Sequence, residues 1–131
     1  MSPGFGFVAC LVLTLVLLVL VVLTGFAAKR RAHITLVVCT LGALYLTVVF
    51  AYELGKIYDI HQAGWITPFH LALARINTVA FLLPAVSGVR TIFRPQTKRV
   101  HRWFAFGVLG LTVLTAITGT IMLALSPLRG T

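Results

Sequence analysis

Four long apolar segments limit what this chain can fold into. They cover residues of about 5–28, 33–52, 68–92 and 103–125. Each is long enough to cross about 30 Å of hydrocarbon as a helix. A helix also satisfies its own backbone hydrogen bonds, which lipid requires of any spanning segment. The sequence therefore predicts an all-α fold, a four-helix transmembrane bundle.

The composition agrees with a membrane protein. Of the 131 residues, 60% are hydrophobic and only 10% are charged. A soluble domain of this size could not bury so much apolar surface, so lipid is the expected solvent. The length fits one integral membrane domain, residues 1–131, whose short loops join the helices in up-down order.

The basic residues indicate how the helices are oriented. Eight of the eleven Lys and Arg residues fall in the loops after the first and third segments. These are Lys29, Arg30, Arg31, Arg90, Arg94, Lys98, Arg99 and Arg102. The positive-inside rule places these two loops in the cytoplasm and both termini outside. The first segment, directly followed by this basic cluster, is expected to be a retained span rather than a signal peptide. We interpret the net charge of +9 as a topology signal and expect no nucleic-acid partner.

Local residues predict where helices begin, bend and touch. Thr67 followed by Pro68 is typical of an N-cap and a first helical position. Pro84 predicts a kink in the third helix. Asn77 is expected to make an interhelical hydrogen bond. Small residues on the fourth helix predict a face for helix contact; they are Gly107, Gly110, Gly119, Thr112, Thr115 and Thr118.

The chain carries four histidines, which sort into two pairs by depth. His33 and His101 begin helices at the cytoplasmic face, whereas His61 and His70 lie on the outer side. Pairs of imidazoles from facing helices hold haem in membrane and soluble bundles, and imidazole also binds copper and zinc. The pattern therefore predicts haem b or copper. The alternative is that these histidines contact lipid headgroups and bind no cofactor.

The only two acidic residues of the chain lie close in sequence to the outer histidines. Glu53, Asp59, His61 and His70 fall within 18 residues and could form a mixed nitrogen and oxygen metal site. Cys10 and Cys39 show no metal-ligand spacing, and we interpret both as small packing residues.

Arg75 is a charged residue within the third apolar segment. A charge at this depth is expected to face the bundle or to extend toward the outer surface. Two roles stay open: a counter-charge for a haem propionate, quinone head or carboxylate, and a structural ion pair with Glu53. His70 and Asn77 share one face of the same helix by their i, i+7 spacing.

An internal repeat links the second and fourth segments. Both read His-x7-Leu-Gly-x3-Leu-Thr, from His33 to Thr47 and from His101 to Thr115, at an offset of 68 residues. The first and third segments show no obvious match. A duplicated hairpin is therefore a hypothesis, in which the two halves are parallel repeats about an axis normal to the membrane.

Residues 33 to about 125 resemble a family of small four-helix bacterial membrane proteins linked to cytochrome oxidase assembly. The resemblance lies in short motifs that contain or adjoin histidines. They are Arg31-Ala32-His33, His61, His70-Leu71-Ala72-Leu73-Ala74, Pro84, His101-Arg102 and Thr118-Gly119. The resemblance implies a histidine-bound haem or metal, a place near haem–copper oxidases, and a bacterial cytoplasmic membrane location.

Three hypotheses about function follow. The first is a respiratory-type membrane protein that holds haem b or a metal ion through the pair His61 and His70, or also through the pair His33 and His101, for electron transfer or oxidase assembly. The second is a cofactor-free accessory subunit of a larger membrane complex such as a respiratory complex. The third is a quinone-binding module that uses Arg75 and His70. No nucleophile elbow, phosphate loop or zinc-protease motif is present, so we name no catalytic residue and favour a protein without enzymatic activity of its own.

Overall fold

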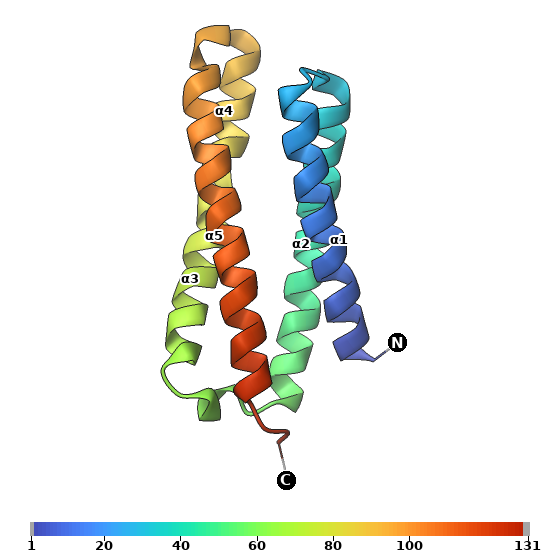
Figure 1. The fold of residues 1–131 in the computed structure, drawn as a ribbon, viewed down its shortest axis with the longest axis vertical. Helices are drawn as coiled ribbons and strands as arrows, with labels where there is room; N and C mark the ends of the chain where they lie inside the picture. Colours follow the sequence, from blue (N-terminus) through green and yellow to red (C-terminus); the bar gives the residue numbers. More distant parts are fainter. Residues whose placement is uncertain (1, 130–131) are drawn as a thin grey trace. The chain divides into compact units, whose positions relative to one another are not determined.

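The computed structural model describes residues 2–129, which fold as helices joined by short turns (Figure 1). The helices are α1 (Pro3–Phe26), α2 (Arg30–Ile57), α3 (Ile66–Ala80), α4 (Leu82–Phe93) and α5 (Lys98–Leu125). Two short 3₁₀ turns, η1 (Ile60–Ala63) and η2 (Pro95–Thr97), precede α3 and α5. Four helical stretches are long and apolar enough to cross a membrane, α3 and α4 together forming the third. The predicted all-α, four-span fold is confirmed.

The first two helices begin earlier than the apolar segments suggested. Ser2 caps α1, where its hydroxyl accepts a 3.3 Å hydrogen bond from the Phe5 amide, and Pro3 takes the first helical position. Helix α2 starts at Arg30, so part of the basic cluster is helical rather than loop. Hydropathy alone misses such ends because polar residues can occupy the first and last turns of a helix.

The third span is interrupted, as Pro84 predicted. The helix breaks at Phe81, between α3 and α4. Proline has no amide hydrogen, so Pro84 cannot donate to the Ala80 carbonyl, and the next backbone bond, from Ala85 to Phe81, is long at 3.4 Å. The predicted N-cap was wrong. Thr67 lies inside α3, and its hydroxyl donates to the Ile60 carbonyl instead, which fastens η1 to the start of the helix.

The chain divides into two compact helical units. One contains residues up to Asp59 together with Leu128 and Arg129, and the other contains residues 60–127. In the first unit α1 packs along α2, and in the second α5 packs along both α3 and α4. Each unit is thus a helical hairpin of two spans.

The buried residues are mostly small and polar, while the large apolar side chains face outward. Buried polar residues are Thr14, Thr40, Thr47, Thr67, Asn77, Ser87, Thr112, Thr118 and Ser126. In residues 2–129 every buried side-chain nitrogen or oxygen has a hydrogen-bond partner. This distribution is typical of membrane helices, because lipid solvates the apolar side chains and interhelical contacts use small and hydroxyl residues.

Each hairpin carries one buried polar bond near its middle. Thr14 and Thr47 join α1 to α2 through their hydroxyls at 3.2 Å. The Asn77 amide and the Thr112 hydroxyl join α3 to α5 with two 3.2 Å contacts. The interhelical bond predicted for Asn77 is confirmed.

Candidate functional site

The clearest polar site in the second unit lies where His70 of α3 meets α5. The His70 Nδ1 atom is 3.1 Å from the Thr118 hydroxyl oxygen. That hydroxyl also lies 3.0 Å from the Leu114 carbonyl of its own helix, to which it donates. A hydroxyl has a single proton, so we assign Thr118 as the acceptor and His70 Nδ1–H as the donor.

Gly119 makes room for the His70 ring. A Cβ atom at this position would lie only 2.7 Å from His70 Cε1. Every other residue type would therefore push the imidazole off α5. Gly107 and Gly110 of the same helix have no neighbour within 4 Å of such a Cβ, so within this unit only Gly119 of the three predicted contact glycines makes a close contact.

The same contact occurs at His101, where α5 meets α4. The His101 Nδ1 atom is 3.1 Å from the Ser87 hydroxyl, which in turn donates to the Pro84 carbonyl at 3.3 Å. A Cβ atom on Gly88 would lie 3.1 Å from His101 Cε1. As at Thr118-Gly119, the imidazole contacts a hydroxyl residue and the glycine that directly follows it.

A third example joins α1 to α2 in the first unit. His33 Nδ1 lies 2.9 Å from the Val21 carbonyl and 3.5 Å from the Thr24 hydroxyl. Gly25 faces the ring, since its Cβ would lie 3.3 Å from His33 Cε1. Gly25 therefore lies in a helix contact. In the turn that follows α1, the residue with a left-handed backbone conformation is Ala28, at φ 53°.

The hydrogen-bond partners in these three imidazole contacts (His33 with Thr24-Gly25, His70 with Thr118-Gly119, His101 with Ser87-Gly88) favour one tautomer of the neutral ring. A carbonyl oxygen can only accept, so His33 must carry its proton on Nδ1. The hydroxyls at the other two have given their proton to a backbone carbonyl. In the neutral imidazole the lone pair is then on Nε2. Metal-binding histidines have a similar arrangement, in which a hydrogen bond from one ring nitrogen to an outer partner orients the ring.

The contacts also extend the sequence repeat to α1 and to the α3–α4 span. Thr14-x9-Thr24-Gly25 in the first matches Asn77-x9-Ser87-Gly88 in the second, at an offset of 63 residues. Thr14 and Asn77 make the buried hydrogen bonds near the middle of each hairpin. Thr24-Gly25 contacts the ring of His33, and Ser87-Gly88 contacts the ring of His101. This match is hard to recognise in the sequence because the shared spacing joins only three positions in each segment. The pairing of a hydroxyl residue with glycine was the available signal.

Within the second unit, the embedded histidines lie at opposite ends of α5. His101 is in its first turn, and the Thr118 that bonds His70 lies 17 residues further on, which is about 25 Å along a helix. This agrees with the predicted assignment of these two residues to opposite sides of the membrane.

The residues of the predicted mixed metal site come from both helical units. Glu53 pairs with Lys56 of its own helix at 2.7 Å, an exposed contact. Asp59 follows α2, and His61 is an exposed residue of η1. In residues 2–129 no group of three or more His, Cys, Asp or Glu side chains forms a metal-binding cluster. The mixed site of Glu53, Asp59, His61 and His70 stays a prediction.

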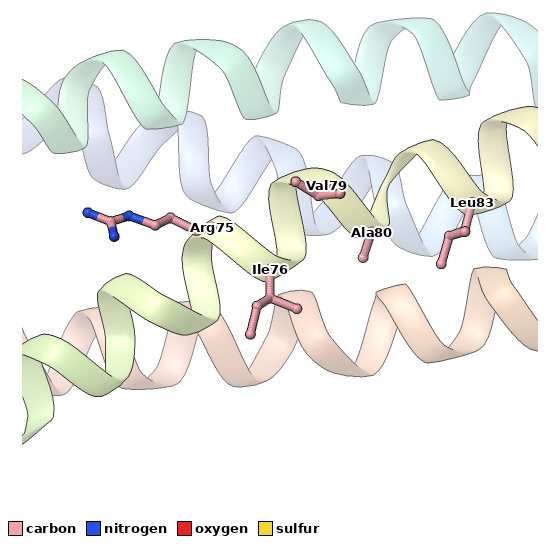
Figure 2. A pocket seen from close by; sticks show the side chains of 5 residues that line it. All are labelled: Arg75, Ile76, Val79, Ala80 and Leu83. Atoms are coloured by element: carbon pink, nitrogen blue, oxygen red, sulfur yellow. The ribbon is translucent and has the colours of Figure 1, made fainter.

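Arg75 lies on a different face of α3 from His70. Its side chain is exposed and extends along the helix toward the start of α3, which is the direction expected for a snorkelling arginine (Figure 2). Beside it, Ile76, Val79, Ala80 and Leu83 line an open groove of about 480 Å³. Because His70 faces α5, this geometry does not support a quinone site built from both residues.

The two cysteines are free thiols, and Cys10 is partly buried while Cys39 is exposed. Comparison of the chain with models of known protein families, with curated proteins and with solved structures found no match.

Proposed function

We propose that this chain is an integral membrane protein that holds haem b or a metal ion such as copper through its helix-embedded histidines. The observation that supports this most is the shared hydrogen bonding of the three imidazole contacts, which favours a lone pair on Nε2. Lipid headgroup contact alone does not require a hydroxyl residue and a facing glycine for each ring.

The donor chemistry fits such a group. Neutral imidazole nitrogen is the usual axial ligand of haem b and a common ligand of copper. His70 is partly buried within a span, and its partner Thr118 is 5% exposed. A bound haem or copper would supply one-electron transfer, and the residues of this chain would set the orientation and basicity of the ligand. His70 would hold such a group on the outer side, with His61 and Arg75 as further candidates, and His33 with His101 would be the ligands on the cytoplasmic side.

The role of the bound group in the cell is proposed as electron transfer or assembly of a respiratory oxidase. The support for this role is the resemblance of residues 33–125 to the small membrane proteins linked to oxidase assembly, together with the membrane-spanning helices. Membrane lipids and a larger respiratory complex are the corresponding partners, and the cytoplasmic membrane of a bacterium is the location.

One observation favours a second candidate function. The imidazole contacts lie at helix interfaces, where a hydrogen bond and a close glycine contact also stabilise packing. A cofactor-free accessory subunit of a larger membrane complex would use the same residues for structure alone.

An absorption spectrum with metal analysis separates the two functions. We expect the protein, purified from its native membrane in mild detergent, to show a Soret band or about one copper per chain. Chelator-treated and metal-reloaded samples provide the control for adventitious metal. A colourless protein without stoichiometric metal that co-purifies with a larger assembly would contradict the proposal and support the accessory subunit.

A further inference from the structure

The groove beside Arg75 combines one positive charge with an apolar floor. Ile76, Val79, Ala80 and Leu83 recur at i, i+3, i+4 and i+7, so they form one continuous stripe from α3 across the break into α4. The Val79 side chain is 66% exposed. Asn77, which bonds α5, lies on another face of the helix, so the stripe is turned away from that contact.

The helical unit that contains Arg75 has no acidic side chain to neutralise its charge. Residues 60–127 contain no aspartate or glutamate. Both carboxylates of the chain, Glu53 and Asp59, belong to the other unit, and Glu53 pairs with Lys56. An arginine within a membrane span is costly and is expected to have an anionic partner. An anion that arrives with a ligand would meet this expectation.

Along the helix, the positive charge comes first and the apolar residues follow, and this order indicates how the charged and apolar parts of a ligand must be arranged. Arg75 is about 14 Å from the start of α3, and its guanidinium reaches back toward that start, while the apolar residues continue about 12 Å deeper (Figure 2). A molecule that matches must place its negative charge near the membrane surface and an apolar chain toward the centre of the bilayer.

We propose that this groove binds an anionic phospholipid. The phosphate pairs with the Arg75 guanidinium, whose planar donors suit phosphate oxygens. One acyl chain lies along Ile76, Val79 and Leu83, and Ala80 leaves space for it at the break between α3 and α4. This inference goes beyond the proposed cofactor function and does not depend on it.

Native mass spectrometry of the delipidated full-length protein tests the proposal. Phosphatidylglycerol and phosphatidylcholine with identical acyl chains are titrated separately. We expect the first phosphatidylglycerol to bind about tenfold more tightly than the first phosphatidylcholine, because the choline cation of phosphatidylcholine offsets its phosphate charge whereas phosphatidylglycerol keeps a net negative charge for Arg75. Arg75→Gln should abolish this preference, Arg75→Lys should keep part of it, and Ala80→Phe should weaken the binding of both lipids by filling the groove.

Arg94→Gln serves as the matched control, because Arg94 is an exposed arginine at the end of α4 and lies outside the groove; it should leave the first-site preference unchanged. Circular dichroism checks that each variant keeps its helices.

An unchanged preference in Arg75→Gln, or unchanged binding in Ala80→Phe, would overturn the proposal. So would displacement of the lipid by millimolar inorganic phosphate, which would indicate a simple anion site. Loss of a co-purifying membrane protein in Arg75→Gln, with lipid binding intact, would assign the charge to a protein contact instead.

Discussion

Replacing Gly119 with valine should separate α3 from α5 and displace His70. A Cβ atom at this position already lies 2.7 Å from His70 Cε1, and the added methyl groups increase the overlap. Relief requires the ring to leave Thr118, which breaks the 3.1 Å bond. Overpacking of this kind costs about 1–3 kcal/mol, and the lost hydrogen bond adds about 0.6 kcal/mol in a membrane protein. The free energy of unfolding, measured in mixed micelles, should fall accordingly.

Gly110→Val is the matched control for this experiment. Gly110 is on the same helix and has no neighbour within 4 Å of the position of a Cβ. Its replacement should change the free energy of unfolding by no more than about 0.5 kcal/mol. Equal stability losses in the two variants would contradict the view that the imidazole contact needs the glycine.

Replacing His70 with alanine should remove the bound cofactor, and replacing Thr118 with valine should weaken its binding. The alanine deletes the proposed ligand. The valine keeps the volume of threonine but removes the oxygen that holds His70 Nδ1. Loss of such an outer partner typically lowers metal affinity about 10–100-fold. Cofactor occupancy by absorption and metal analysis, at matched helicity, measures both effects.

Thr120→Val controls for the loss of a threonine hydroxyl. Thr120 is exposed on the same helix, and its hydroxyl donates only to the Ala116 carbonyl, at 2.9 Å. This variant should retain full occupancy. If His70→Ala kept the spectrum and metal content of the wild-type protein, His70 would be a packing residue and the ligand would have to be sought elsewhere.

The sequence predicted the helices well because membrane spans require long uncharged segments, and the break near Pro84 follows from its missing amide hydrogen. The cap at Thr67 was wrong because a threonine before proline has another use here: its hydroxyl fastens η1 to α3. Local sequence signals do not show which distant group will compete for a side chain.

The histidines were recognised from sequence, but their partners were not. Which residue faces His70 depends on how α3 and α5 are aligned along each other, 48 residues apart in the chain. A local pattern does not encode that alignment. The hydroxyl–glycine pairs at Thr24, Ser87 and Thr118 are visible in the sequence, but their order does not show which histidine each pair contacts, since His70 meets Thr118 and His101 meets Ser87. The orientation of both termini stays a prediction from the basic loops.

The most direct test of the central claim is the position of the proton on the His70 ring. Solid-state nitrogen-15 NMR of ring-labelled histidine in lipid bilayers distinguishes a protonated ring nitrogen from one that carries a lone pair or a metal. Spectra of the unmodified protein are compared with those of His70→Ala, so that the signals lost in the variant report on His70. The account predicts a protonated Nδ1 and an Nε2 that is unprotonated or metal-bound at neutral pH. A proton on Nε2 with a bare Nδ1 would contradict it.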